Sequence, residues 1–201
     1  MSPEPVTGPG RGRVTPQAIT RAITAYAPVN AHGAHLRAAA VLVPLVDGPR
    51  GVEVIFILRP TTMPTHPGQV AFPGGAIDPG DADSWHAALR EADEELGIPP
   101  ERVTPVGRLD DLPTITSFHV TPWVGWVPDD LALRPSPREV DEAFRVPLAT
   151  LLDPTQRRTM LGRWRGGPRR MHFYLGAHHV IWGATAEMLT NLVQVLRAAG
   201  V

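Results

Sequence analysis

Two long apolar runs in the first third of the chain constrain the fold more than any other feature. Residues 38–46 and 52–58 are almost continuously apolar, and residues 47–51, Asp-Gly-Pro-Arg-Gly, separate them. A strand with one face in water alternates apolar and polar residues, so an unbroken apolar run indicates a strand buried on both faces. The short, turn-forming connection indicates a β-hairpin. The sequence therefore predicts a hairpin at the centre of a sheet that is covered on both sides.

Helical and extended patterns are mixed along the rest of the chain, which predicts an α/β fold. Thr15 and Pro16 suit the N-cap and first position of a helix that continues to about Tyr26. A second helix is expected over residues 185–198, where Met188, Leu192, Val195 and Ala199 recur at helical spacing and are interpreted as core residues. Further strands are expected over residues 69–72, 103–109 and 118–127, and a late hairpin over 158–161 and 171–175, around Gly166-Gly167-Pro168.

The ends and the size of the chain predict one soluble domain. Residues 1–14 hold three prolines and three glycines and lack the apolar core of a signal peptide, so a disordered tail is expected there. With 201 residues and 43% apolar content, residues 15–201 are expected to form a single domain with a well-buried core. No run approaches the ~20 apolar residues of a membrane span, so we expect a cytoplasmic protein without a membrane partner.

Composition excludes several kinds of chemistry. The chain has no cysteine, which excludes disulfides, thiol nucleophiles and thiolate zinc sites. It also has no lysine, so all 19 basic residues are arginine, and Schiff-base chemistry and a P-loop lysine are excluded. A net charge of −1 gives no strong field toward nucleic acid, which is not expected as a partner.

The residues most suggestive of chemistry lie in one short acidic segment, residues 90–98. Glu91, Glu94 and Glu95 follow at i, i+3 and i+4, which places them on one face of a helix. Like charges held side by side destabilise a helix, so a positive partner is expected. A hard divalent cation such as Mg²⁺ or Mn²⁺ prefers oxygen ligands and would fit. The alternative is a solvated acidic face, which is common in glutamate-rich helices.

The segments on either side of the acidic helix favour the metal-site interpretation. Residues 72–75, Phe-Pro-Gly-Gly, form a glycine turn that can bring backbone groups close to a ligand. Gly97 and the two prolines that follow at 99–100 end the helix abruptly. The candidate N-caps are Asp81, Asp83 and Ser84.

This segment resembles the Nudix box, Gly-x5-Glu-x7-Arg-Glu-U-x-Glu-Glu-x-Gly-U, in which U is a bulky apolar residue. The second half of the box matches at Arg90, Glu91, Glu94, Glu95, Gly97 and Ile98. Ala92 is small for a U position. Counting forward from Gly75 places Asp81 at the position of the first Glu, but Asp81 lies one residue farther from Arg90 than the pattern requires. The resemblance covers roughly residues 36–152 and implies a Nudix fold, an α/β/α sandwich around a mixed β-sheet.

A second resemblance concerns residues 56–75, which are similar to the extra signature of coenzyme A diphosphatases, a Nudix subfamily. The matching residues are Arg59 and the run His66-Pro67-Gly68-Gln69-Val70-Ala71-Phe72-Pro73-Gly74-Gly75. That subfamily also carries the one-residue offset, matched here by Gly74, Gly75, Asp78 and Asp81. The sequence departs from the signature at Ile57, Leu58 and Pro60, which bears on the substrate more than on the reaction.

The resemblance implies roles for individual residues. Glu91, Glu94 and Glu95 would bind the metal, with a backbone carbonyl of the Gly74-Gly75 turn, assigned to Gly75, as a further ligand. Arg90 would orient the acidic face, and its i, i+4 spacing allows it to pair with Glu94. Glu139 is the candidate for an additional acid from a distant loop, as general base or further ligand, because Glu-Val often precedes an apolar-Pro-Leu segment in this family, here residues 146–148. Alternatively, Glu139 is a loop or capping carboxylate.

Candidates for substrate binding each have a structural alternative. Arg59 could bind a phosphate or be a surface charge, and His66 could donate to a phosphate or form a structural hydrogen bond. Gly74 and Gly75 could bring backbone groups to the substrate. His119 and the pair His178-His179 do not form a recognisable metal spacing, and Trp123, Trp126 and Trp182 could stack on an adenine or belong to the core.

Three functions remain open from the sequence. The leading hypothesis is metal-dependent hydrolysis of coenzyme A, or of an acylated or oxidised form, to 3′,5′-ADP and 4′-phosphopantetheine. The second is the same chemistry on another nucleoside diphosphate derivative, such as ADP-ribose, a dinucleotide or a nucleoside triphosphate. The third is a non-catalytic Nudix-like module that binds a nucleotide, against which the intact glutamates argue. The expected partner is thus a small nucleoside diphosphate, and a homodimer is possible.

Overall fold

The structure is a computed structural model that describes residues 14–31, 35–164, 167–176 and 178–201. The tail expected over residues 1–14 lies outside the described residues except for Val14. The elements are α1 (Pro16–Thr24), β1 (Arg37–Gly48), β2 (Gly51–Leu58), β3 (Val70–Ala71), β4 (Gly74–Ala76), α2 (Ser84–Leu96), η1 (Pro100–Arg102), β5 (Thr104–Arg108), β6 (Leu112–Pro113), β7 (Phe118–Trp126), β8 (Glu142–Pro147), α3 (Leu148–Leu152), η2 (Pro154–Gln156), β9 (Arg157–Trp164), β10 (Gly167–Gly176), β11 (His179–Ile181) and α4 (Gly183–Ala198).

The two apolar runs form the predicted hairpin at the centre of the larger sheet. β1 and β2 are antiparallel, and Gly48 lies opposite Gly51, so the strands continue to a tighter turn than expected. β1 also pairs with β7 in parallel, with Val43 opposite Val124. The main path of the sheet is β3-β2-β1-β7-β5, and β4, β6 and β8 pair with β1, β7 and β2. The sheet is therefore mixed, as predicted.

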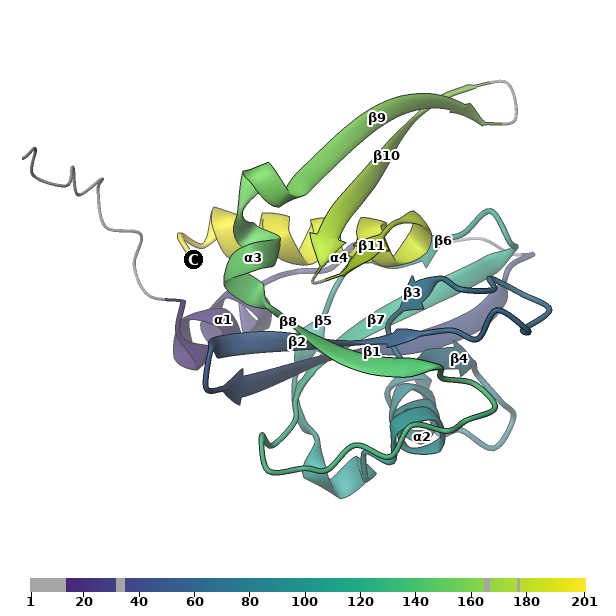
Figure 1. Cartoon of the computed structure of the whole chain (residues 1–201), viewed down its shortest axis with the longest axis horizontal. Coiled ribbons are helices and arrows are strands. Elements are labelled where there is room, and N and C mark those ends of the chain that lie inside the picture. The colour runs from purple at the N-terminus through teal and green to yellow at the C-terminus, as the bar shows by residue number, and fades with distance from the viewer. Residues whose placement is uncertain (1–13, 32–34, 165–166, 177) are drawn as a thin grey trace, which may run out of the picture.

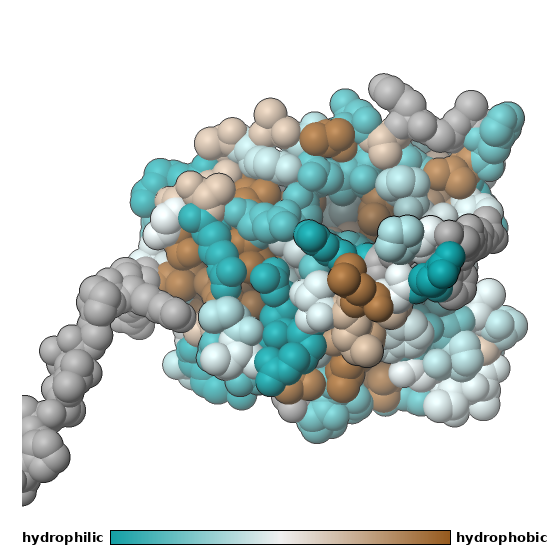
Figure 2. Space-filling model, turned by 90° about the horizontal axis from the view of Figure 1, so that it is seen from above, coloured by the Kyte–Doolittle hydropathy of each residue, from teal (hydrophilic) through white to brown (hydrophobic). Residues whose placement is uncertain are grey.

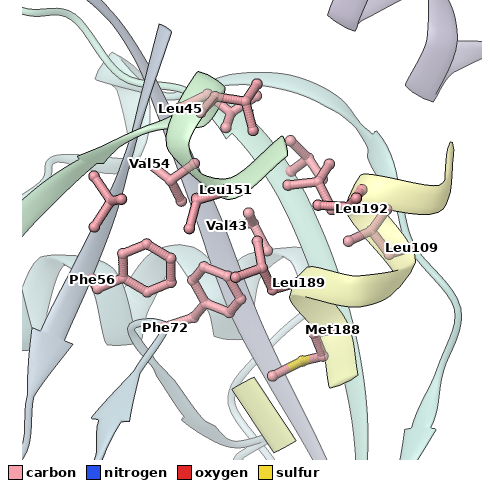
Figure 3. Close-up of a cluster of buried hydrophobic side chains, with 14 of the residues drawn as sticks. Val43, Leu45, Val54, Phe56, Phe72, Leu109, Leu151, Met188, Leu189 and Leu192 are labelled. Carbon is pink, nitrogen blue, oxygen red and sulfur yellow. The ribbon is translucent and has the colours of Figure 1, made fainter. Parts of the chain in front are cut away.

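Helices cover both faces of this sheet (Figure 1). Side chains alternate along β1, so that Leu42 and Val46 pack with α2 while Val43 and Leu45 pack in the cluster that includes α1 and α4. Figure 3 shows part of the latter cluster, in which Phe72 lies beside Leu189 of α4 and Phe56 lies next to Phe72. The α/β/α sandwich around a mixed sheet is confirmed.

Local sequence signals explain where the first helix begins, but one core assignment in the last helix is wrong. The Thr15 hydroxyl accepts a hydrogen bond from the Ala18 backbone N–H at 3.3 Å, as an N-cap does, and Pro16 occupies the first turn. In α4, Met188, Leu192 and Val195 are buried as expected. Ala199 is exposed because the helix ends at Ala198, so its periodicity no longer points into the core.

A second sheet of three strands, β11-β10-β9, carries the late hairpin. β9 and β10 are longer than the sequence indicated, and the hairpin extends beyond α4 at the top of Figure 1. The face seen from above is a mixture of hydrophilic and hydrophobic residues (Figure 2). Within the described residues, no helix combines the length and hydropathy needed to span a membrane.

Candidate active site

The acidic segment lies on α2, whose ends are fixed by capping. The Asp83 carboxylate accepts a hydrogen bond from the His86 backbone N–H at 2.9 Å, which makes Asp83 the N-cap among the three candidates. Ser84 instead accepts from the Trp123 indole N–H at 3.0 Å. At the other end, Gly97 has a φ of 63°, a conformation that glycine adopts without strain.

The three glutamates of α2 lie in different environments. The Glu95 side chain is 3% exposed, that of Glu91 15%, and that of Glu94 56%. The difference arises because α2 packs against β1 and β4, so that the helix face toward the sheet buries Glu95 while Glu94 stays at the rim. Two of the three carboxylates are therefore removed from water, unlike those of a solvated acidic face.

Gly74 and Gly75 lie in the short strand β4 and not in the turn expected from the sequence, and they contact both buried glutamates. The Gly74 N–H donates a hydrogen bond to Glu95 Oε2 at 2.9 Å. A Cβ atom on Gly75 would lie 2.5 Å from Glu91 Oε1, so only glycine leaves room for this carboxylate. The structure thus brings Gly74, Gly75, Glu91 and Glu95 together.

Burial changes the pKa values of these carboxyl groups. Burial, with a smaller contribution from the charge of Glu91, raises the pKa of Glu95 to about 8, although the hydrogen bond from the Gly74 N–H lowers it. Burial also raises the pKa of Glu91, whereas the hydrogen bond from Arg90 lowers it. Glu139 contributes to the upward shift of the pKa of both groups, so its charge acts on the same site.

Glu139 reaches the site because its loop is tied to the end of α2. The Ser136 N–H donates to the Glu95 carbonyl at 2.9 Å, and the Arg134 N–H donates to the Leu96 carbonyl at 2.7 Å. The Glu139 N–H in turn donates to the Ser136 carbonyl at 3.0 Å. Backbone contacts therefore carry an acid that is distant in sequence to the acidic helix.

Arg90 uses all of its donors within the protein. Its Nη1 donates to Glu91 Oε1 at 2.9 Å and to Glu94 Oε2 at 3.2 Å. Its Nε and Nη2 both bond the Asp81 carboxylate at 3.0 Å, and Nη2 also donates to the Ala76 carbonyl at 3.1 Å. A guanidinium has five N–H groups, so none is left for a ligand. The acid that is offset in sequence, Asp81, is the carboxylate that holds Arg90 in place.

Arg59 faces the same buried glutamate and keeps donors free. Its Nη1 lies 3.9 Å from Glu95 Oε1, an ion pair too long for a hydrogen bond, and its side chain is 17% exposed. The Nε atom is buried and has no hydrogen-bond partner among the residues that the structure describes. Buried donors without partners are costly, and an anionic ligand would satisfy them.

His66 is not brought to the acidic cluster by any contact that the structure describes. It is exposed in the loop between β2 and β3, with a φ of 54°, and its Nδ1 lies 3.1 Å from Gln69 Oε1. The loop itself is closed by the Arg59 N–H, which donates to the Gln69 carbonyl at 3.0 Å. The contact of His66 with Gln69 therefore agrees with the structural hydrogen bond that was the alternative to phosphate binding.

The donor set of α2 fits a hard cation. Glu91 and Glu95 offer buried carboxylate oxygens. Arg90 donates a hydrogen bond to Glu91 and shares its charge with Glu94 and Asp81, while Arg59 stays 3.9 Å from Glu95, so no cation among the described residues fully balances the two buried charges. Glu94 is turned toward Arg90, and the three side chains do not converge within 4.8 Å as a set in the described part of the chain. Mg²⁺ commonly binds through one or two carboxylates and keeps several waters, so such a spacing suits it.

The remaining candidates lie elsewhere or have other partners. His119 Nε2 lies 3.2 Å from Asp111, and the Trp126 indole donates to Thr20 at 2.9 Å. A pocket of about 700 Å³ lies between α1 and α4 and includes none of the predicted site residues. His178 and His179, in contrast, converge with Glu142, a grouping that the sequence did not reveal because the acid is 36 residues away.

Comparison with known proteins identifies the family of this chain. Residues 36–164 match the NUDIX domain family. The uncharacterized Nudix hydrolase NudL of Photorhabdus laumondii is 40% identical over 158 residues, which cover 79% of this chain and 84% of the relative. NudL of Cronobacter sakazakii is 42% identical over 163 residues, covering 78% of this chain and 81% of the relative.

A solved structure supports the fold alone. The MutT/nudix family protein from Enterococcus faecalis superposes with a TM-score of 0.51 at 15% identity, over 84% of this chain and 63% of that chain. Together with the match over residues 36–164, these similarities show that the chain belongs to the Nudix family and is a Nudix hydrolase.

Proposed function

We propose that this enzyme hydrolyses the diphosphate bond of coenzyme A, or of an acylated or oxidised form, to 3′,5′-ADP and 4′-phosphopantetheine. The observation that carries the proposal is the contact between the coenzyme A-type segment and the acidic helix. Arg59 and Gly74, from residues 56–75, both face Glu95, at 3.9 Å and 2.9 Å. The segment that resembles the substrate signature thus contributes to the same site as the metal-binding residues.

Mg²⁺ or Mn²⁺ would be held by Glu91, Glu94 and Glu95 with the Gly75 carbonyl. When bound, such a cation supplies charge shielding for the diphosphate and lowers the pKa of a coordinated water. The fit rests on two buried carboxylates whose pKa burial raises, because a cation restores their charged form.

The side chains divide the remaining tasks. Arg59 binds a phosphate oxygen with the donors that no described residue occupies. Arg90 positions Glu91 and Glu94 and does not touch the substrate, since its five donors are used. Glu139 accepts the proton of the attacking water. His66, in its exposed loop, would donate a hydrogen bond to a substrate phosphate.

The test is a product analysis. Purified protein is incubated with Mg²⁺ or Mn²⁺ and, separately, with coenzyme A, acetyl-coenzyme A, ADP-ribose, NADH and nucleoside triphosphates, and products are identified by mass. We expect coenzyme A compounds to give the highest kcat/KM and the two named products. Reaction in H₂¹⁸O identifies the phosphorus atom that is attacked.

Two outcomes would contradict the proposal in different ways. A higher kcat/KM for ADP-ribose, a dinucleotide or a nucleoside triphosphate would reject coenzyme A as the substrate but keep the reaction. No cleavage of any compound with either metal, by protein whose circular dichroism shows a folded α/β chain, would reject the assigned machinery. Glu101→Gln, an exposed glutamate of η1 outside the cluster, serves as the matched control for substitutions of α2.

A further inference from the structure

Two adjacent histidines meet a glutamate at a place remote from the acidic helix. His179 Nε2 lies 2.9 Å from Glu142 Oε2, and His178 Nε2 lies 3.1 Å from Glu142 Oε1. All three ligand atoms lie within 4.8 Å of one another. Among the residues that the structure describes, this is the one group of three histidine, aspartate or glutamate side chains whose ligand atoms lie this close to one another.

The three side chains lie on the opposite face of the larger sheet from α2. Glu142 begins β8 and pairs with Leu58 of β2. Side chains alternate along a strand, so Glu142 shares its face with Phe144 and Val146, which belong to the cluster that includes α4. Arg59, one residue beyond Leu58, is directed to the other face, where it meets Glu95. The sheet therefore separates this group from the candidate active site.

Neighbouring elements hold the two imidazoles in place. His179 begins β11 and pairs with Gly176 of β10, which fixes its backbone. The Phe144 ring lies 4.7 Å from the His179 ring, and the two imidazole rings are 4.2 Å apart. The His179 side chain is 19% exposed and that of His178 65%, so the group is reachable from solvent. Packing thus orients the ligand atoms while one side stays open.

We propose that Glu142, His178 and His179 form a second metal site, for a transition-metal dication of the Zn²⁺ kind. Two imidazoles and one carboxylate are a donor set that suits Zn²⁺ and not Mg²⁺, which prefers oxygen. With Zn–N and Zn–O bonds of about 2.0–2.2 Å, neighbouring ligands of a tetrahedral ion lie about 3.3 Å apart. The two histidine–glutamate separations of 2.9 and 3.1 Å differ from this value by a few tenths of an ångström, and the ligand atoms of all three residues lie within 4.8 Å of one another.

The site joins the two sheets. Glu142 belongs to the larger sheet and His179 to the three-stranded sheet that carries the β9–β10 hairpin. A metal bound to both stabilises the folded chain, since the ligands are brought together only in that state. The site is structural in this role and leaves its remaining coordination to water.

The test measures zinc binding with the acidic site kept occupied by Mg²⁺. Purified chain in excess MgCl₂ is titrated with ZnCl₂ by calorimetry, and CoCl₂ is used as a spectroscopic probe of tetrahedral coordination. We expect one zinc ion per chain and visible absorption bands of tetrahedral Co²⁺. At a zinc concentration a hundred times Kd, the Tm should rise by about 5–10 °C.

Three substitutions connect the binding to these residues. Glu142→Gln, His178→Ala and His179→Ala should each weaken zinc binding by about tenfold or more and remove the cobalt bands. His178 is largely exposed, so His178→Ala tests the site without threatening the fold. His172→Ala is the matched control, because His172 contacts Thr159 on the hairpin and lies outside the group.

Either of two results would overturn the proposal. The first is that the wild-type chain in excess Mg²⁺ binds no zinc. The second is zinc binding of equal affinity in the wild-type chain and in the three variants, which would place the ion elsewhere. Because the readouts are binding and Tm, they do not depend on the enzyme's substrate.

Discussion

At the scale of single residues, the candidate site is defined by what burial does to charge. Glu91 and Glu95 stand on the same helix as Glu94 and have the same chemistry, but only the first two are removed from water. Arg59 and Arg90 are likewise both partly buried guanidinium groups, yet the donors of Arg90 are all used and Nε of Arg59 is not. Residues of the same type are therefore expected to have different roles: the buried glutamates differ from Glu94, and Arg59 differs from Arg90.

Glu95→Gln should abolish most of the activity and preserve the fold. The amide oxygen can still accept from the Gly74 N–H, but the side chain no longer contributes a negative charge to a metal site. We expect kcat to fall by more than about 100-fold, since even partners of metal ligands cost 10- to 100-fold. Steady-state kinetics at saturating Mg²⁺ measures this, and the Tm should stay near that of Glu101→Gln. Turnover close to wild type in the folded variant would show that Glu95 is not a ligand.

Arg59→Ala should lower kcat/KM by about 10- to 100-fold, the value of a hydrogen bond between charged groups in a buried site. Arg59→Lys should recover part of the loss, because it restores the charge but not the fork of two donors. Arg102→Ala, which removes an exposed arginine paired with Asp130, is the control and should leave kcat/KM unchanged. Equal effects of Arg59→Ala and Arg102→Ala would reject a phosphate-binding role.

At the scale of secondary-structure elements, the site depends on the close contact between α2 and β4. β4 is only three residues long and pairs with β1, with Gly75 opposite Ala40. This pairing holds Gly74 and Gly75 against the two buried glutamates. The position of the helix along its own axis is set by its caps, Asp83 and Gly97.

Gly75→Ala should impair catalysis by moving Glu91. The added Cβ would lie 2.5 Å from Glu91 Oε1, so the carboxylate must shift. A displacement near 1 Å at a reacting site can cost about 100-fold in rate, and we expect kcat/KM to fall by that order. Gly80→Ala is the matched control, because nothing lies within 4 Å of its added Cβ. If Gly75→Ala were as active as Gly80→Ala, Glu91 would not need its observed position.

Asp83→Ala should destabilise the chain by about 1 kcal/mol through loss of the N-cap of α2. Asp83→Asn should cost little, because asparagine caps as well as aspartate does. The measurement is the free energy of unfolding in urea. Equal destabilisation by alanine and asparagine would assign the effect to the ion pair with His86 at 2.8 Å, and not to the cap.

At the scale of the whole molecule, a sheet buried on both faces separates two sites. α2, which carries the acidic cluster, lies on one face, and α4 and β11, which carries His179, lie on the other (Figure 1). The core beneath α4 includes Phe56, stacked on Phe72 and Phe144 with ring centroids 4.9 and 5.8 Å apart. Phe144 also contacts the His179 ring, so this core supports the proposed zinc site.

Phe56→Ala should lower the free energy of unfolding by about 4 kcal/mol, as expected for a fully buried phenylalanine in a close-packed core. Phe56→Leu should cost distinctly less, because most of the volume remains filled. Urea unfolding followed by circular dichroism measures both, and the exposed Val29→Ala should stay within about 0.5 kcal/mol of wild type. A small effect of Phe56→Ala would mean that the core relaxes into the space.

Much of the fold could be predicted because it depends on local signals. The unbroken apolar runs predicted the central hairpin, Thr15-Pro16 predicted the start of α1, and Gly97 predicted the end of α2. The short strands β4, β6, β8 and β11 were missed because two to six residues carry too little periodicity, and pairing alone defines them. Ala199 was misplaced because periodicity does not say where a helix ends.

The sequence by itself determined the acidic helix and the family, since spacing within one segment is fixed by chain geometry. Only the tertiary structure decided which glutamates are buried, that Asp81 holds Arg90, that Arg59 keeps free donors, and that Glu142 meets His178 and His179. Burial and pairing between distant residues depend on which faces pack together. A linear pattern does not contain that information, because it arises only when the whole sheet and both helical layers have formed.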